Sequence, residues 1–409
     1  MHTDLHDPDA PGHLKPRGSS QGGLRQYNER VVLQALRLHG ALPAAELARL
    51  THLTAQTISM ITKRLLDDGL LLKGAPQRGK VGQPSVPLSL NPDGAFSIGI
   101  KVGRRSLDVL LLDFAGQARE RWTIGYDFPD PDAVLPEIGL RLREVRRKLG
   151  PERRERLQGI GIAAPLQLSA WRELLGADPE VAAKWDRIDL RAEVEALSGL
   201  PVQLLKDTAA ACVAELVAGR GRALKSFLYV FVDTFIGGGL VLDSQLRAGL
   251  NGNAGAIGSL PLGMGRGDSP PAQLLGVASL LNLEQAWAAA GLATDAAGDE
   301  RALQAPWEPV TRAWLEDAAS AVALAVDSAA CLLDLEAVIL DGSFSPALRD
   351  LMQASVQAAL NRYDWRGVVR PAVLTGTIGS DARALGGALL PLYANFAPDR
   401  DLFLKTAGV

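Results

Sequence analysis

A change of pattern at Asn91-Pro92 constrains the fold of this 409-residue chain more than any other feature. Beyond it, short apolar runs of strand character alternate with helical patterns, and this succession occurs twice. Strands are expected over 96–102, 106–113, 118–124, 157–163, 202–205, 227–232, 239–242, 338–340 and 372–374, and helices over 134–149, 206–219, 271–290, 308–334, 347–362 and 381–392. The succession predicts an α/β body of two lobes with a cleft between them.

The segment before residue 91 predicts a small helical module with two short strands. Apolar spacing indicates one helix over 24–38, a second that Pro43 opens, and a third that Thr54 caps and Gly69 ends. Strands are expected over 70–73 and 86–90, joined by a basic, glycine-rich loop. This order is typical of a winged helix-turn-helix, which we assign to residues 23–90. The polar residues 1–22 are expected to be a disordered tail.

The charge is distributed unevenly along the chain. Residues 15–90 carry eleven Lys and Arg against four Asp and Glu, whereas residues 91–409 carry 32 against 39. Basic charge alone would fit a helical bundle with a solvated charged face, but the turn and the wing favour binding to double-stranded DNA. The residues expected to contact DNA are Gln56, Thr57, Ser59, Lys63 and Arg64 on the third helix and Arg78, Lys80 and Gln83 in the wing.

The distribution of histidine and cysteine excludes several kinds of site. All five histidines lie within the first 52 residues, so the body has no histidine to act as a general base or a metal ligand. Two cysteines, Cys212 and Cys331, make a disulfide framework unexpected and favour a cytoplasmic protein. The polar start has no apolar stretch of the kind found in signal peptides. We expect no metal and no cofactor.

Several motifs in the body together resemble one family, the ROK proteins, and within it the transcription regulators. The segment GIAAPLQ resembles a turn of the family, KDTAAACVAE the segment that carries the kinase general base, DTFIGGGLVLDSQL a phosphate loop, GNAGAIGS the sugar loop, and VILDGS and LTGTIGSDARALGGALL the adenosine-side segment and final helix. The resemblance extends across nearly the whole chain beyond the tail. It implies a two-lobed actin-like (ribonuclease H-like) body over 91–409, with lobes over about 91–205 plus the C-terminal helix and about 206–378.

The departures from the family pattern point away from catalysis. The first phosphate loop has Lys101 where family kinases have aspartate, and Arg104 and Arg105 follow. The second loop carries Asp233 and Phe235 in place of glycines, so a backbone nest cannot wrap phosphate closely. The sugar loop has alanine and serine where the family has glutamate and histidine, and the family's zinc-binding cysteines are missing from 264–276. Phosphoryl transfer needs a base, a phosphate cradle and a metal-bridged nucleotide together, so we expect no enzyme.

The resemblance also implies where an effector would bind. The expected contacts are Pro165, Asp207, Asn253, Gly255 and Ser259. Asp207 is equally interpretable as a helix cap, since an alanine-rich helix follows it. The cations at 101, 104 and 105 are interpreted as a solvated strand end, with an anion site as the alternative.

The sequence therefore predicts a cytoplasmic transcriptional regulator, a repressor of carbohydrate uptake or catabolism genes. A small sugar-like effector would bind a degenerate kinase cleft and bias the DNA-binding heads of a homodimer, or of a higher homo-oligomer, on an inverted-repeat operator. Two alternatives remain open. One is an active ROK sugar kinase with a DNA-binding appendage, and the other is a ligand-independent regulator whose body only dimerises.

Overall fold

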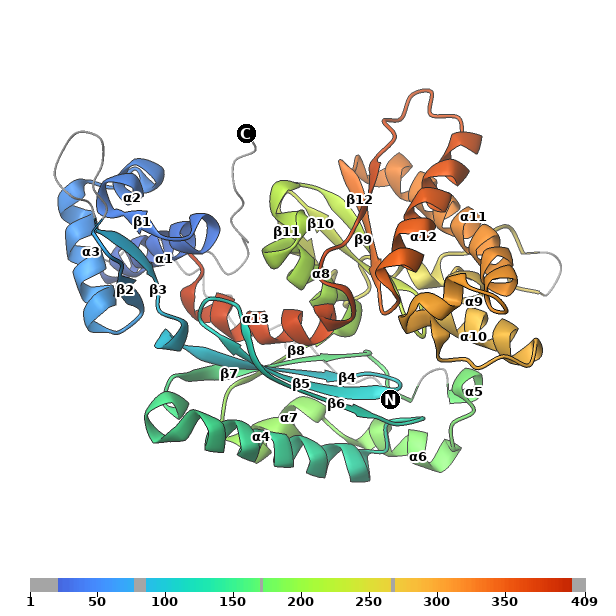
Figure 1. Ribbon diagram of the computed structural model, residues 1–409, viewed down its shortest axis with the longest axis horizontal. Coiled ribbons are helices and arrows are strands. Elements are labelled where there is room, and N and C mark those ends of the chain that lie inside the picture. The colour runs from blue at the N-terminus through green and yellow to red at the C-terminus, as the bar shows by residue number, and fades with distance from the viewer. Residues whose placement is uncertain (1–20, 77–85, 170–171, 266–268, 399–409) are drawn as a thin grey trace, which may run out of the picture.

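The computed structural model describes residues 21–76, 86–169, 172–265 and 269–398. These residues form three sheets with helices packed around them, and the smallest sheet belongs to the N-terminal module, called the head below (Figure 1). The predicted tail lies almost wholly outside the described residues. Among the described residues, no helix is both long and apolar enough to span a membrane.

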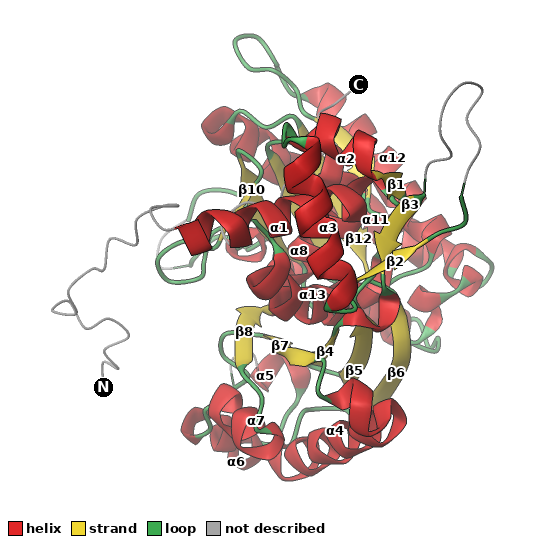
Figure 2. Ribbon diagram, turned by 90° about the vertical axis from the view of Figure 1, so that its left-hand side faces the viewer, coloured by secondary structure: helices red, strands yellow, loops and turns green. Residues whose placement is uncertain are grey.

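The head is built from three helices and a small antiparallel sheet. The helices are α1 (Gln21–His39), α2 (Ala44–Thr51) and α3 (Ala55–Asp67), and the strands β1 (Leu42–Pro43), β2 (Leu71–Lys73) and β3 (Pro87–Leu90) pair in the order β1-β3-β2. The Thr54 side chain accepts a hydrogen bond from the Thr57 amide, which confirms the predicted cap. Ala55, expected on the inner face, is exposed, because the buried face begins one turn later at Ile58. Figure 2 views the molecule from the side of the head.

The first sheet of the body has the strand order β6-β5-β4-β7-β8. Its strands are β4 (Phe96–Val102), β5 (Ser106–Asp113), β6 (Ala118–Gly125), β7 (Leu157–Ala164) and β8 (Val202–Lys206). One face is covered by α4 (Pro131–Arg154), interrupted at Gly150, and α7 (Leu190–Ser198), with α5 (Arg172–Leu175) and α6 (Pro179–Lys184) nearby (Figure 2). Alternate residues point to opposite faces, so Val109 packs toward α4 and Leu110 toward α13 (Ala382–Phe396).

The second sheet repeats this topology. Its order is β11-β10-β9-β12-β13, from β9 (Phe227–Val232), β10 (Gly237–Leu242), β11 (Gln245–Arg247), β12 (Ala337–Gly342) and β13 (Ala372–Thr375). In both sheets the first three strands are antiparallel and the last two are added in parallel. Its outer face is covered mainly by α10 (Leu280–Ala289), α11 (Glu308–Leu333) and α12 (Pro346–Ala359), with α9 (Leu275–Ala278) beside them, and its inner face by α8 (Asp207–Ala218).

Two expectations about element bounds were wrong. The expected helix over 271–290 begins only at Leu275 and breaks at Ser279, where an extended residue caps α10. Strand β10 begins at Gly237 rather than Gly239. Those glycines carry no apolar signal, yet they are needed for packing, because a Cβ at Gly239 would lie 2.5 Å from the Cβ of Cys212 on α8.

Candidate functional site

The predicted DNA-contacting face of α3 is exposed. Gln56, Ser59, Lys63 and Arg64 are all accessible, while Thr57 is half-buried and its hydroxyl lies 2.9 Å from that of Thr54. The helix presents this face because Ile58, Ile61 and Leu65 pack into the head on the other side. The wing residues Arg78, Lys80 and Gln83 lie outside the described residues.

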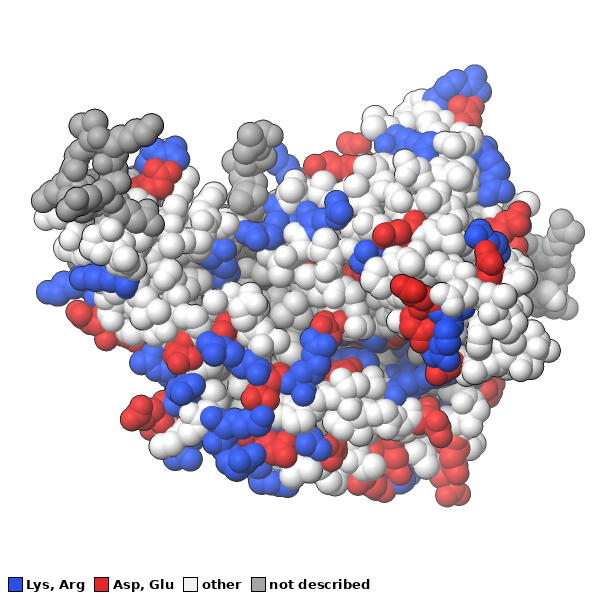
Figure 3. Space-filling view, viewed as in Figure 1, with Lys and Arg blue, Asp and Glu red and all other residues white. Residues whose placement is uncertain are grey.

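Two features of this face were not anticipated from the sequence. Met60 is 59% exposed between the predicted contact residues, where it could meet an apolar groove atom such as a thymine methyl. Arg64 already forms an ion pair with Glu29 of α1, so its charge is partly neutralised before any phosphate arrives. In Figure 3 the visible surface of the body mixes both signs of charge.

The first of two neighbouring cavities lies at the start of α8, between the two sheets. It has a volume of about 120 Å³, and its polar lining comes from Arg104, Lys206, Asp207, Thr208 and Ser259. Phe235 and the glycine backbone at 237 and 258 complete the wall. Two of the five expected effector contacts, Asp207 and Ser259, therefore lie in one cavity.

The other three expected contacts are placed differently. Pro165 is buried at the end of β7, Asn253 is exposed, and neither lines this cavity. Gly255 has φ +75° and packs against β10, where a Cβ would lie 2.7 Å from the Cα of Gly239. Its role is to let two backbones approach closely, so it shapes the wall without offering a side chain.

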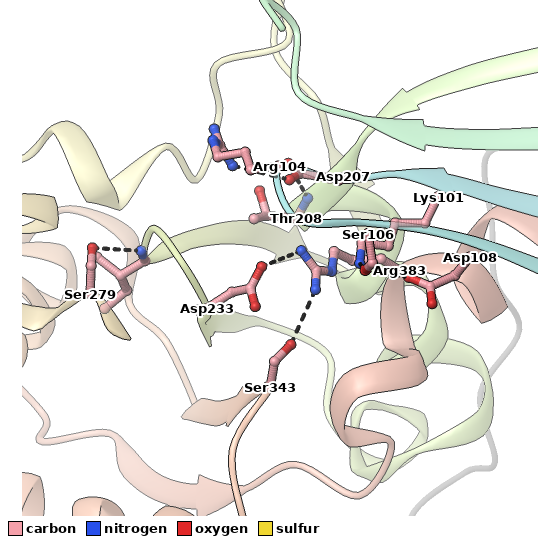
Figure 4. Close-up of polar contacts among 12 residues, drawn as sticks. Lys101, Arg104, Ser106, Asp108, Asp207, Thr208, Asp233, Ser279, Ser343 and Arg383 are labelled. Carbon is pink, nitrogen blue, oxygen red and sulfur yellow. Dashed lines mark hydrogen bonds and ion pairs between the residues drawn. The ribbon is translucent and has the colours of Figure 1, made fainter. Parts of the chain in front are cut away.

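Asp207 is the first residue of α8 and not its cap, which is Lys206, so the interpretation as a helix cap is wrong. Its side chain is almost fully buried and accepts a hydrogen bond from the amide of the next residue, Thr208, at 2.8 Å. Its other oxygen lies 3.7 Å from Arg104, at the cavity (Figure 4). The buried Thr208 hydroxyl has no hydrogen-bond partner within the described part of the chain. A carboxylate oxygen and an unpartnered hydroxyl at one wall are suited to hydrogen bonds with a polyhydroxylated ligand.

The interpretation of residues 101–105 as a solvated strand end is wrong for Lys101 and Arg104. Lys101 is 5% exposed, and its ammonium group donates to Asp108 at 2.6 Å and to Ser106 at 2.5 Å. Arg104 lies 4.6 Å over the ring of Phe235. Only Arg105 is substantially exposed, and it forms an ion pair with Glu284 of α10. The cations turn inward because carboxylates and an aromatic ring meet them there.

A second cavity, of about 240 Å³, adjoins the first and shares Arg104 with it. Its centre is the buried guanidinium of Arg383, at the start of α13. Arg383 forms an ion pair with Asp233 at the end of β9 and donates to the Ser343 hydroxyl at 3.1 Å (Figure 4). This ion pair fills the position where the resemblance implies a phosphate loop.

The charges of this cavity alter one another's pKa. Burial alone would raise the pKa of Asp233, but Arg383 and Lys101 outweigh burial and lower the pKa to about 2. Burial lowers the pKa of Lys101, with Arg383 acting in the same direction and Asp108 opposing both. Asp233 is therefore ionised throughout the physiological range, and Arg383 and Lys101 compensate its charge.

Arg383 is the functional residue that the sequence analysis missed. It stands in an otherwise apolar helix segment, ARALGGALL, and a charge there was the available signal. Its partners Asp233 and Ser343 belong to other elements, so no local pattern connects them. Among the described residues, no group of three or more His, Cys, Asp or Glu is arranged to hold a metal ion.

Comparison with known proteins places these observations in a family. A model of the ROK family matches residues 97–393. The xylose repressor of Caldicellulosiruptor bescii is 25% identical over 237 residues, 58% of this chain and 58% of that protein. The repressor Mlc of Escherichia coli is 22% identical over 241 residues, 58% of this chain and 56% of that protein. Each match thus spans less than two thirds of the relative's length.

Solved structures support the same fold. A ROK family transcriptional regulator, described as a homologue of Escherichia coli Mlc, superposes with a TM-score of 0.66 at 19% identity, covering 93% of this chain and 98% of that one. A ROK glucokinase from Streptomyces griseus, in complex with glucose and AMPPNP, has a TM-score of 0.58 at 20% identity, covering 72% and 99%. The fold class predicted from the sequence is confirmed.

Proposed function

The chain belongs to the ROK family, and from this premise we propose that it is a DNA-binding transcriptional regulator, a repressor of carbohydrate uptake or catabolism genes. In this proposal a sugar-like effector binds the cleft and is not phosphorylated. The observation that carries the proposal is the pairing of Arg383 with Asp233, which fills the phosphate side of the cleft with the protein's own charges. A nucleotide would have to displace this pair and leave one of its charges buried without a partner.

The DNA-binding part of the proposal is supported by the exposed polar face of α3. In this proposal Gln56 and Ser59 read base edges and Lys63 neutralises a phosphate, and the exposure of all three side chains supports it. A single head contacts few base pairs, so a homodimer on an inverted repeat is the expected arrangement, within the cytoplasm where the chromosome lies. The test is a mobility shift with the DNA upstream of the gene at low and moderate salt. No shift at low salt would contradict the regulator proposal.

The effector part is supported by the wall formed by Asp207, Thr208 and Ser259. These groups supply oxygen acceptors and hydroxyls at one side of a small cavity, which suits the hydroxyls of a sugar. Two relatives named as xylose repressors and a related glucokinase solved in complex with glucose make free aldoses the first candidates. Thermal unfolding of the full chain with D-xylose and D-glucose tests this, because a ligand that binds only the folded state raises the melting temperature. If neither sugar raises it, the ligand-independent alternative is favoured.

The kinase alternative retains one supporting observation. Asp207 stands where the resemblance implies a general base, and related structures include a glucokinase. Against it, Asp233 and Phe235 occupy the phosphate loop, and Ala256 replaces the acid of the sugar loop. Losing a charged hydrogen bond to a sugar costs about 1.5–3 kcal/mol. ATP consumption with a panel of aldoses decides between the two, and turnover that disappears in Asp207→Ala would establish the kinase.

A further inference from the structure

The two central helices are each fixed to a different sheet by glycine contacts. A Cβ added at Gly161 of β7 would lie only 1.9 Å from the Gly387 carbonyl of α13. There is thus no room for a side chain between them, and α13 lies directly on the first sheet. On α8, Thr208 is similarly close to Gly237 of the second sheet, at 2.8 Å from an added Cβ. On α13 the two backbones meet without an intervening side chain, and on α8 the Thr208 methyl group fits against the glycine, so both contacts leave little room for sliding. Each helix is thus packed closely on one sheet.

The two halves meet where α8 and α13 touch and where the cleft charges pair. A Cβ at Gly386 of α13 would lie 1.7 Å from the Ala210 carbonyl of α8, so the two helices are held together at this point and the halves can only rotate about it. Toward the cleft, Arg383 of α13 is joined to Asp233 and Ser343 of the second half. The ion pair is thus a bridge that sets how far the second sheet stands from the first on the cleft side.

The head rests on both halves through the last turn of α1. Arg37 donates to the Phe114 carbonyl at 3.3 Å and lies 5.3 Å from the rings of both Phe114 and Tyr393, which belong to the first half. The next residue, Leu38, accepts a hydrogen bond at 3.1 Å from Arg222, which follows α8 and belongs to the second half. Neighbouring residues of one helical turn are therefore tied to two different bodies. Figure 1 shows α13 running from beneath the head toward α8.

We propose that the last turn of α1 senses the separation of the two sheets, and that the Arg383–Asp233 bridge sets this separation. In this proposal Arg383 and Arg222 are positioning residues: Arg383 acts at the cleft, and Arg222 acts where the second half contacts α1. A change at the cleft alters the distance between Phe114 and Arg222, and the head must reorient because both hold it. The inference rests on the proposed function, since it states how the cleft would regulate DNA binding.

A double-mutant cycle on DNA affinity tests the coupling in the full chain. We expect Arg383→Met to change the affinity for the upstream DNA by about 2- to 30-fold, and the change to fall below about 2-fold in an Arg222→Met background. Arg141→Met is the matched control, because Arg141 pairs with Glu137 and Glu144 on α4, away from both sites. Equal fold-changes in both backgrounds, or an effect no larger than the control's, would overturn the proposal.

Two further measurements keep the test decisive. The double variant Asp233→Asn with Arg383→Met removes both charges, so neither charge is left buried without a partner. Arg383→Lys keeps the positive charge, and its DNA affinity should lie closer to that of the wild type than the affinity of Arg383→Met does. Hydrogen exchange at the amides of residues 36–40 needs no DNA. We expect these amides to exchange faster in the Arg383 variants than in the wild type, and at the wild-type rate in Arg141→Met. Unchanged exchange in the Arg383 variants would contradict the coupling, whether or not the wild type binds DNA. A wild type that does not bind DNA would contradict the regulator proposal but not the coupling.

Discussion

At the scale of single residues, Arg383 determines which charges the cleft can hold. Its guanidinium is 4% exposed and is held between the Asp233 carboxylate and the Ser343 hydroxyl. An uncompensated buried charge costs several kcal/mol, so each member of the pair is tolerated only because the other is present. Because protonation of Asp233 would leave Arg383 without its partner charge, the contribution of the pair to stability should depend on pH.

Replacing Asp233 with Asn should flatten the acid dependence of stability. The folded pKa of about 2 lies below the usual aspartate pKa of 3.8, so ionised Asp233 stabilises the wild type above about pH 4, and this stability is lost as the pH falls toward 2. The full contribution is about 2 kcal/mol, of which about 1 kcal/mol is lost by pH 3. Urea unfolding at pH 5 and pH 3 should show the gap between wild type and variant narrowing on acidification. A gap independent of pH would mean that Asp233 is not the titrating partner.

Substitutions on α3 should separate affinity from sequence preference. Lys63→Ala removes the proposed phosphate contact, so binding should weaken on every DNA sequence and the slope of log affinity against log salt concentration should decrease in size by about one. Gln56→Ala removes the proposed base contact and should instead relax the preference at one operator position, at a cost of about 1–3 kcal/mol. Titrations on the operator and on unrelated DNA distinguish the two. If Gln56→Ala weakens both DNAs equally, α3 does not read bases through that residue.

Residues whose roles follow from local pattern could be predicted, and those that depend on distant partners could not. Thr54 was predicted as a cap because the helix it starts lies next to it in sequence. Arg383 was missed because its partners are 150 and 40 residues away. Lys101 was placed in solvent for the same reason, since a charge near a strand end gives no sign that Asp108 faces it across the β4–β5 pair.

At the scale of elements, the packing of α13 against its two neighbours requires glycine, which has no side chain, at each contact. Gly387 lies against the first sheet and Gly386 against α8, each at a backbone-to-backbone approach. The helix therefore tolerates little added volume, although glycine is a poor helix former by itself. Its stability comes from the packing that those glycines permit.

Gly386→Ala should destabilise the protein despite the better helix propensity of alanine. The new Cβ would lie 1.7 Å from the Ala210 carbonyl, so α8 and α13 must separate, at a cost of about 1–3 kcal/mol or more. Gly276→Ala is the control, because no atom lies within 4 Å of its added Cβ. Urea unfolding of the two variants measures the difference. Equal stabilities would show that the two helices separate without cost.

Strands were predicted more reliably than their glycine-rich edges. The expected strands 96–102, 106–113 and 227–232 match β4, β5 and β9, because alternating or continuous apolar runs mark them. Strand β1 was missed, since two residues carry no periodicity and pairing with β3 alone defines it. The start of β10 was misplaced because its glycines are chosen for contact with α8.

At the scale of the whole molecule, the charge asymmetry restricts where DNA can lie. Residues 15–90 carry an excess of positive charge, and residues 91–409 carry 32 Lys and Arg against 39 Asp and Glu. This asymmetry favours the head as the part of the chain that contacts DNA in the proposed function. In that proposal a signal from the cleft reaches the DNA through the head.

Asp207→Ala should reduce the effector response and leave effector-free DNA binding intact. The variant removes the buried acceptor of the smaller cavity without touching α3. An effector changes DNA affinity only through its preference for one lobe arrangement, typically 1–3 kcal/mol of coupling. DNA affinity measured with and without D-xylose or D-glucose, for wild type and variant, gives the coupling directly. An unchanged response would leave Asp207 as a helix-stabilising residue only.

The position of α13 also determines when the body can fold during synthesis. Residues 382–396 pack on the inner face of the first sheet, so this face stays uncovered until the ribosome has released this late segment. The buried cluster of the head, within residues 32–88, continues into residues 384–397, so part of the head's packing waits for the same segment. We therefore expect nascent chains to complete the packing of the first sheet and of the head only after α13 has emerged.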